Sequence, residues 1–192
     1  MLRCGIIVTG TPGTGKTTLS KRLAKDINAE YLSISQLVAE NRLFEGYDKK
    51  RRSRIVNLAK ARSRVSSTLS TGALTIVDTH TPEGIVPKRM TRQVIVLRCH
   101  PSALVRRLRA RGWEASKIRE NVLAELLDVC FINAVKQYGL LRVVQLDTSR
   151  ASVRQSVSAA KRVVAKRSSL RTTKIDWITA LEKEGELERY LT

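Results

Sequence analysis

Aromatic residues are scarce in this chain, and acidic residues are few for its length. Only 4% of the 192 residues are Phe, Trp or Tyr, so the core must be mainly Leu, Val, Ile and Ala. Lys and Arg number 36 against 17 Asp and Glu, which gives a formal net charge of +19. One small anionic ligand would not balance this excess. The two explanations are a polyanionic partner, most simply RNA, and a solvated basic surface without a partner.

Long apolar runs and paired cysteines are also missing. No segment approaches the roughly 20 consecutive apolar residues that span a bilayer, and the N-terminus lacks the features of a signal peptide. We therefore expect a soluble, cytoplasmic protein without a membrane partner. Cys4, Cys99 and Cys130 show no CxxC spacing, so neither a disulfide framework nor a zinc site is expected.

A phosphate-binding pattern stands close to the N-terminus. Residues 10–17, GTPGTGKT, fit G-x-x-x-x-G-K-[ST] between the apolar run CGIIV and a helix-like segment. In that context backbone N–H groups at a helix N-terminus form a cradle for anions. Lys16 can reach the β- and γ-phosphates, and the Thr17 hydroxyl can ligate Mg²⁺. The alternative is a glycine-rich turn with an ordinary surface lysine, but the pattern predicts a nucleoside triphosphate site.

Apolar runs alternate with helical periodicity along most of the chain. Such alternation predicts an α/β fold, a five-stranded parallel sheet with helices on both faces. The region 44–54 is expected to be a loop, and Ser35 is expected to cap the helix that follows the second strand. The expected strands are 3–9, 30–35, 72–80, 93–101 and 142–147, and the expected helices are about 16–27, 36–43, 53–71, 102–112, 116–138 and 151–166.

The composition changes after about residue 166. The segment KRSSLRTTK is polar and basic, and an amphipathic helical pattern resumes after it. We therefore expect a kinase-like domain over 1–166 and a C-terminal appendage over 167–192.

Two candidate residues follow the expected strand at 72–80. Asp78 comes directly after β-branched residues, so its carboxylate should emerge at the C-terminal edge of the sheet and hold the Mg²⁺ shell. The alternative is an Asp that only initiates a turn. His80 could orient water or a phosphate, or could be structural.

Arginines gather in the segment RRLRARGW. Arg107 and Arg111 are four residues apart, so on a helix they could point together at one site. Arginine suits phosphoryl transfer because its fork meets several phosphate oxygens. A solvated basic helix face is the alternative, whereas the adjacent glycine favours a closing lid.

The motifs GTPGTGKTTLSKRLA, LFEGYD, VDTH and RLRARGW, with the segment IRENVLAELLDV, resemble the nuclear and archaeal adenylate kinase isoenzyme 6 family. The resemblance covers about residues 3 to 150, and the archaeal branch is the more similar one. These proteins are atypical adenylate kinases and ATPases that assist assembly of the small ribosomal subunit. The resemblance implies a P-loop kinase fold with sheet order 2-3-1-4-5, Mg²⁺ with ATP as substrate, and transfer to AMP.

The resemblance also implies roles for individual residues. Asp78 would be the Walker B carboxylate, His80 the histidine linked to hydrolysis, and Arg111 the lid arginine on ATP. Arg107, expected from its spacing to point to the same site, completes the candidate catalytic set with Lys16. A lid would lie at about 110–120, and a nucleoside-monophosphate arm at about 33–56. The residues implied to bind ATP are Gly10, Gly13, Thr14, Gly15, Lys16, Thr17, Thr18, Arg111 and Arg150. Those implied to bind AMP are Ser35, Arg42 and Gly46, and those implied to bind the metal are Thr17 and Asp78.

One residue of the arm departs from the family pattern. Nuclear relatives carry an arginine in the short helix of that arm, placed to hold the AMP phosphate, and Ala39 stands there in this chain. Arg42 is the candidate substitute, although an offset of three residues rotates it by roughly 60° around a helix. Transfer to AMP is therefore one hypothesis, and hydrolysis coupled to a macromolecular partner is another. A kinase of a small alcohol would need a base, for which only Glu40, Glu45 and Asp48 are near.

Basic residues are concentrated in two blocks outside the P-loop. Eight lie between positions 49 and 77 and eight between 148 and 175, and neither block contains an acidic residue. Family members bind a ribosomal protein of the small-subunit platform, and the resemblance implies such a partner here. Because aromatic residues are sparse in both blocks, we expect any RNA contact there to be to backbone phosphates.

Overall fold

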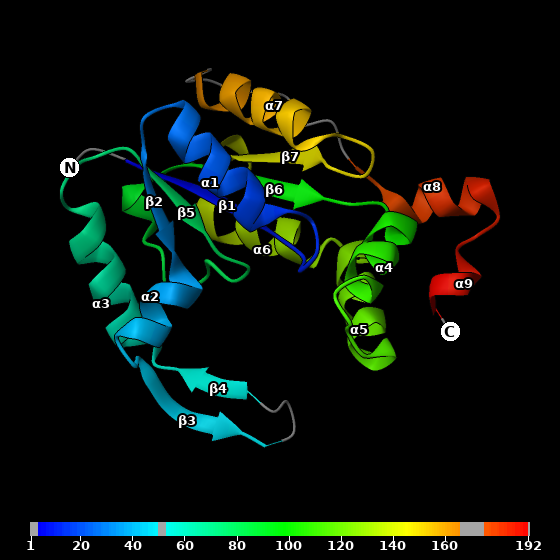
Figure 1. Ribbon diagram of the computed structural model, residues 1–192, viewed down its shortest axis with the longest axis horizontal. Helices are drawn as coiled ribbons and strands as arrows, with labels where there is room; N and C mark the ends of the chain where they lie inside the picture. The colour runs from blue at the N-terminus through cyan, green and yellow to red at the C-terminus, as the bar shows by residue number, and fades with distance from the viewer. Residues whose placement is uncertain (1–3, 50–52, 166–174, 192) are drawn as a thin grey trace.

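The structure, a computed structural model, describes residues 4–49, 53–165 and 175–191. Its centre is a sheet of five parallel strands in the spatial order β2-β5-β1-β6-β7 (Figure 1). Counted along the chain within this sheet, the order is 2-3-1-4-5, which confirms the predicted sheet and its order. The strands are β1 (Gly5–Gly10), β2 (Glu30–Ser33), β5 (Thr75–Asp78), β6 (Thr91–Arg98) and β7 (Val143–Asp147).

Helices connect the strands and extend the fold beyond the sheet. Within the described ranges, none of them is long and apolar enough to cross a bilayer. Two short 3₁₀ turns, at Lys88–Met90 and Leu140–Arg142, precede β6 and β7. The helices are α1 (Lys16–Asp26), α2 (Ile34–Glu40), α3 (Leu58–Leu69), α4 (Pro101–Arg109), α5 (Ala115–Leu126), α6 (Val129–Tyr138), α7 (Val153–Ala165), α8 (Trp177–Glu184) and α9 (Glu188–Leu191).

The side chains of the central strands divide between two cores, because successive residues of a strand point to opposite faces. Ile6 and Val8 of β1 pack with α1 and α7. Ile7, which lies between them, packs on the opposite face with α2, α3 and α6. Helices therefore cover both faces, as the sequence predicted.

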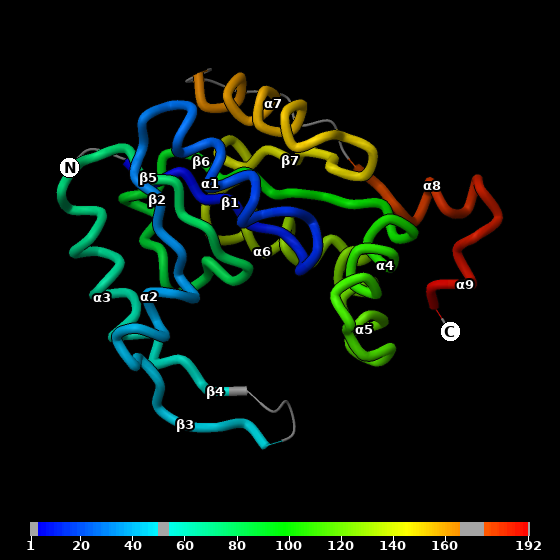
Figure 2. Tube along the Cα trace, in the orientation of Figure 1, coloured from blue at the N-terminus to red at the C-terminus, as the bar shows by residue number. Residues whose placement is uncertain are grey.

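A third apolar cluster lies beyond the sheet and includes the C-terminal helices. Figure 2 shows α8 and α9, the red end of the chain, beside the green α4 and α5. Residues 166–174, where the predicted appendage begins, lie outside the described ranges. The buried members of the cluster are Cys99, Ala103, Leu104, Leu108, Ile118, Val122, Leu126, Trp177, Leu181 and Tyr190.

The region 44–54 was wrongly predicted to be a loop. Its described residues, apart from Lys49 in a turn, belong to the antiparallel pair β3 (Phe44–Asp48) and β4 (Ser53–Val56). The Arg54 guanidinium lies 4.9 Å from the centre of the Phe44 ring, so a basic residue contributes to the hairpin instead of interrupting it. The helix predicted over 53–71 consequently begins only at Leu58.

The caps of two helices show why their starts differ from the prediction. Ser33, not Ser35, caps α2, because the Ser33 hydroxyl accepts a hydrogen bond from the Gln36 N–H at 3.3 Å. Asn57 caps α3 in the same way, accepting from the Lys60 N–H at 2.9 Å. Each cap lies in extended backbone directly before its helix.

The single long helix predicted over 116–138 is wrong, because the helix breaks at Asp128. Asp128 adopts a left-handed conformation with φ of 56° and separates α5 from α6. Its carboxylate forms an ion pair with Arg98 at the end of β6. Apolar periodicity continues across this break, so it could not reveal a turn that is stabilised by a distant strand.

A buried network of charges joins these elements. The Arg98 side chain is 1% exposed and donates to the Glu125 carboxylate at 2.7 Å and to the Gln145 side chain at 2.5 Å. The same Glu125 oxygen accepts from the Trp177 indole at 3.1 Å. Together with Asp128, these contacts connect β6, α5, β7 and the C-terminal helix α8.

Replacing Arg98 by Met should lower the free energy of unfolding by about 3–5 kcal/mol, because Glu125 would stay buried, and Asp128 half-buried, without their cation. Urea denaturation of the whole chain measures the change. Arg22→Met is the control, since the Arg22–Asp26 pair at 2.9 Å lies on the surface and should contribute under about 1 kcal/mol. Equal losses in the two variants would contradict the prediction.

Candidate active site

The P-loop, residues 10–17, runs from the end of β1 into α1 through three glycines with positive φ. Gly10 has φ of 140°, and a Cβ there would lie 2.4 Å from the Leu97 carbonyl oxygen. Gly13 has φ of 96°, and its Cβ would meet the Leu104 side chain of α4 at 2.8 Å. Gly15, at φ of 97°, stands at the N-cap of α1. The backbone can therefore take this path only without side chains at these points.

Hydrogen bonds hold the P-loop from two sides. The Thr11 hydroxyl donates to the Glu125 carboxylate at 2.5 Å, and the Thr148 hydroxyl donates to the Thr14 carbonyl at 2.9 Å. The Lys16 ammonium donates to the Thr11 carbonyl at 3.1 Å. Thr11 and Glu125 were not among the predicted site residues. The segment ENVLAELLDV, one of the motifs of the family resemblance, contains Glu125. That motif was the sequence signal that could have pointed to Glu125.

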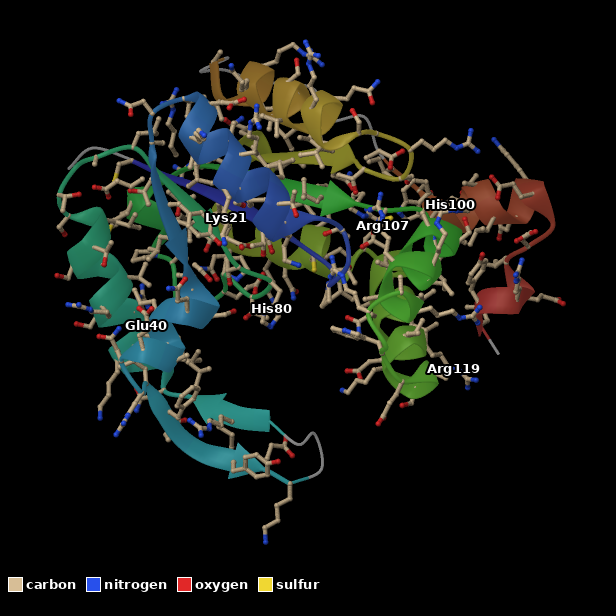
Figure 3. The ribbon with its side chains drawn as sticks, in the orientation of Figure 1. Lys21, Glu40, His80, His100, Arg107 and Arg119 are labelled. Carbon is tan, nitrogen blue, oxygen red and sulfur yellow. The ribbon has the colours of Figure 1, made fainter. Side chains whose placement is uncertain are left out.

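A cavity of about 430 Å³ adjoins the P-loop and is named here the P-loop cavity. The candidate site residues that line it together include Lys16, Thr17, Asp78, His80 and, from α2, Ser35. Figure 3 shows His80 on the loop after β5, facing the space below the P-loop. The lining residues are Pro12, Gly13, Gly15, Lys16, Thr17, Thr18, Ser33, Ser35, Asp78, Thr79, His80, Arg111 and Trp113.

A second cavity of about 290 Å³ adjoins the first and is named here the side cavity. The two share four lining residues, of which Arg111 is the only charged one. The side cavity reaches the loop after β7, where Thr148 and Ala151 line it. The pair of cavities therefore extends from Asp78, across the P-loop, to the last strand of the sheet.

The two predicted catalytic arginines have different surroundings, although both line the side cavity. The Arg107 guanidinium donates to the Thr148 carbonyl at 2.6 Å and so holds the loop after β7. Arg111 lies beyond the end of α4 and not on the same helix, because α4 ends at Arg109 and Gly112 turns the chain with φ of 71°. Arg111 is exposed and faces both cavities.

Asp78 and Thr17 are suited to a magnesium ion. The Asp78 side chain is 6% exposed at the end of β5, and one of its oxygens accepts from the Tyr31 hydroxyl at 3.0 Å. A carboxylate and a hydroxyl that line one cavity are the oxygen donors that Mg²⁺ prefers, and phosphate oxygens complete its shell. Burial and the Asp78 charge raise the pKa of Tyr31 to about 12. Tyr31 therefore stays a neutral donor, a role that no sequence spacing indicated.

Lys16 and His80 influence each other's charge. Burial lowers the pKa of the Lys16 ammonium, and the Asp78 charge partly opposes that shift. Loss of surrounding water, followed by the Lys16 charge, lowers the pKa of the His80 imidazole, while Asp78 again acts in the opposite direction. His80 is consequently a neutral imidazole at pH 7, able to accept a proton.

Several predicted ligand residues lie away from both cavities. Arg42 is not on a helix, because α2 ends at Glu40 and Arg42 turns the chain with φ of 49°. The prediction that Arg42 lies one helical turn beyond Ala39 is therefore wrong. Gly46 belongs to the hairpin strand β3, and neither it nor the exposed Arg150 lines either cavity.

Known proteins resemble this chain in sequence. A family model described as an AAA domain matches residues 6–128. The adenylate kinase isoenzyme 6 homolog FAP7 of Saccharomyces cerevisiae is 40% identical over 161 residues, which cover 83% of this chain and 80% of that protein. The chain belongs to the adenylate kinase isoenzyme 6 family. Its archaeal relatives include a protein of Saccharolobus solfataricus, provisionally named an adenylate kinase, which is 40% identical over 152 residues and 78% of each chain.

Solved structures resemble the fold of this family member. Shikimate kinase from Bacteroides thetaiotaomicron matches with a TM-score of 0.58 at 19% identity, over 84% of this chain and 98% of that one. Shikimate kinase from Acinetobacter baumannii matches with a TM-score of 0.55 at 14% identity, over 84% and 92% of the two chains. At these identities the likeness shows the P-loop kinase fold.

The His80 imidazole should titrate below its usual pKa of about 6.5. Lys16→Met should raise that pKa, because it removes a neighbouring cation, and Asp78→Asn should lower it further, because it removes an anion. Proton NMR measures both shifts. The chain has two histidines, so loss of one resonance in His80→Asn assigns the signal. A His80 pKa at or above the usual value would contradict the surroundings described here.

Proposed function

We propose that this chain is a cytoplasmic adenylate kinase that transfers the γ-phosphoryl group of ATP to AMP and yields two ADP. The observation that carries the proposal is the P-loop cavity. There Lys16 and Thr17 of the P-loop, Asp78 of the sheet edge and Arg111 beyond α4 line one space with Ser35 of α2. Membership of the adenylate kinase isoenzyme 6 family supports the same reaction.

In the proposed mechanism the protein supplies position and positive charge. The bond between the γ-phosphorus and the β–γ bridging oxygen breaks as an AMP phosphate oxygen bonds to that phosphorus. Lys16 and Arg111 neutralise charge on the transferred group and on the leaving oxygens. Thr17 and Asp78 would hold Mg²⁺, which when bound neutralises charge on the phosphate oxygens.

AMP suits this cavity as an acceptor because its phosphate is already ionised and needs no general base. Asp78 is the sole carboxylate among the described residues that line the cavity. A kinase of a small alcohol would need a carboxylate base on the acceptor side, and none of the carboxylates near the arm, Glu40, Glu45 and Asp48, lines the cavity. We propose that residues 33–56 are the arm that receives AMP and residues 110–120 the lid over ATP. In Figure 1 the β3–β4 hairpin and helices α4 and α5 project to the same side of the sheet.

Arg111→Ala should lower kcat for AMP-dependent ADP formation by about 10²-fold, because it removes one cation from the transferred group. The measurement follows ADP formed from Mg·ATP with and without AMP. Arg89→Ala is the control, since this exposed residue precedes β6 and lines neither cavity. An unchanged kcat would remove Arg111 from the lid role. Absence of AMP-dependent ADP in the wild-type chain would overturn the proposed function.

The second candidate function is an ATPase that serves assembly of the small ribosomal subunit, with a ribosomal protein or rRNA as partner. The observation that favours it lies at α2: Ala39 stands where the family resemblance implies a phosphate-binding arginine, and Arg42 lies beyond the end of that helix. Hydrolysis needs no AMP site. The neutral His80 imidazole beside Asp78 and Lys16 could accept a proton from the attacking water.

Ala39→Arg should lower the KM for AMP by about ten-fold, the effect of one charge-assisted hydrogen bond. Ala39 is one helical turn from Ser35 and shares its helix face, so a long cationic side chain there can reach the P-loop cavity. Ala39→Gln is the control of similar length without charge. Steady-state kinetics measures KM, and phosphate release without AMP measures hydrolysis. An unchanged KM in Ala39→Arg would show that the missing arginine does not limit AMP binding.

A further inference from the structure

A groove lined by arginines lies at α4, α5 and α9 and is distinct from the P-loop cavity and the side cavity. It consists of adjoining cavities of about 430 and 330 Å³ bounded by α4, α5 and α9. The two share four residues, and we name them together the arginine groove. Its lining residues are Ser102, Val105, Arg106, Arg109, Trp113, Ala115, Ile118, Arg119, Val122, Arg189 and Tyr190.

The positive charges extend along this groove. Arg106 lines only one of the two cavities, Arg119 lines only the other, and Arg109 and Arg189 line both. Figure 3 shows Arg119 on the side of α5 that faces the C-terminal helices. No carboxylate is among the described residues that line the groove. Arg189 forms an ion pair with Glu186 at 3.1 Å on the surface. The four exposed arginines that line the groove together form a strongly positive strip.

An exposed aromatic ring stands at one end of the strip. Trp113 is 37% exposed and lines the groove near Arg119. Val105, Ile118 and Val122 supply apolar surface beneath the charges. An aromatic face beside guanidinium groups can stack a nucleobase while the arginines hold its phosphates.

From this arrangement we propose that the arginine groove binds single-stranded RNA through its phosphates, with one base stacked on Trp113. The proposal rests on the proposed function in one respect, because it names a surface for the RNA partner of that protein. The groove lies outside both basic blocks of the sequence, which contain none of its four arginines.

The distribution of charge favours a strand over a compact anion. A single phosphate or a triphosphate is held best where cations converge on one point, whereas these arginines follow a line across two cavities. An acidic peptide could also follow such a line. It has no base to stack on Trp113, so the ring distinguishes the two polyanions.

The test is fluorescence anisotropy of a labelled 12-nucleotide single-stranded RNA with the full-length chain at several salt concentrations. The groove variant combines Arg106→Gln, Arg119→Gln and Arg189→Gln. The variant should bind RNA at least ten-fold more weakly. The slope of log affinity against log salt should fall by about 2, since each lost phosphate contact on a single strand contributes about 0.7.

The matched control removes the same number of charges elsewhere, by Lys88→Gln, Arg89→Gln and Lys136→Gln. These side chains are exposed and lie outside the groove and both basic blocks. The control should bind RNA as the wild type does. Equal loss in the two triple variants would show diffuse attraction by net charge alone and would overturn the proposal. If tripolyphosphate or polyglutamate of equal charge competed with the labelled RNA as strongly as unlabelled RNA does, the proposal would also be overturned.

Trp113 gives an independent readout of stacking. Trp113→Ala should weaken RNA binding by about ten-fold without changing the salt slope, and Trp113→Phe should restore most of the affinity. An unchanged affinity in Trp113→Ala would exclude the stacked base. AMP-dependent ADP formation by the wild-type chain is measured in parallel. If the wild-type chain forms no AMP-dependent ADP, the kinase function is overturned and the RNA result stands. If it forms ADP but the groove variants bind RNA as the wild type does, only RNA binding at the arginine groove is overturned.

Discussion

One buried carboxylate, that of Glu125, holds together parts of the chain that are far apart in sequence. It accepts from Arg98 at 2.7 Å, from the Cys99 N–H at 3.0 Å, from Trp177 at 3.1 Å and from Thr11 at 2.5 Å. A charge this deeply buried is tolerated only when a counter-ion and hydrogen bonds satisfy it. The end of β6, the helices α5 and α8 and the P-loop therefore pack together around Glu125.

The shape of the P-loop depends on that meeting. Thr11 is fixed by Glu125, and Thr14 is fixed by Thr148 after β7, so both sides of the loop are held by later parts of the chain. Gly13 lies against Leu104 of α4, where no side chain would fit. Because α4 and α5 flank the proposed lid, the elements that would close over ATP are anchored to the loop that would hold its phosphates.

The sequence predicted the parts of the structure that local pattern controls. The alternation of strand and helix patterns predicted the sheet and the helices on both of its faces. The P-loop pattern singled out Lys16 and Thr17, which in the structure line one cavity with Asp78 and His80. Prediction from the sequence failed where contacts between residues far apart in the chain determine the local structure. The turn at Asp128 depends on Arg98, and the hairpin of β3 and β4 includes an arginine that stacks on Phe44. Tyr31 reaches Asp78 only because β2 and β5 are neighbours, which no local spacing reveals.

Trp113 joins the two surfaces for which ligands are proposed, because it lines both the P-loop cavity and the arginine groove. If residues 110–120 are the lid, as proposed, a lid position that favours RNA in the arginine groove would also change the shape of the P-loop cavity, which Trp113 lines. Coupling between binding sites is reciprocal, so a change in ATP affinity caused by RNA must equal the change in RNA affinity caused by ATP. On these two proposals, the segment around Trp113 would be the physical link between phosphoryl transfer and RNA binding.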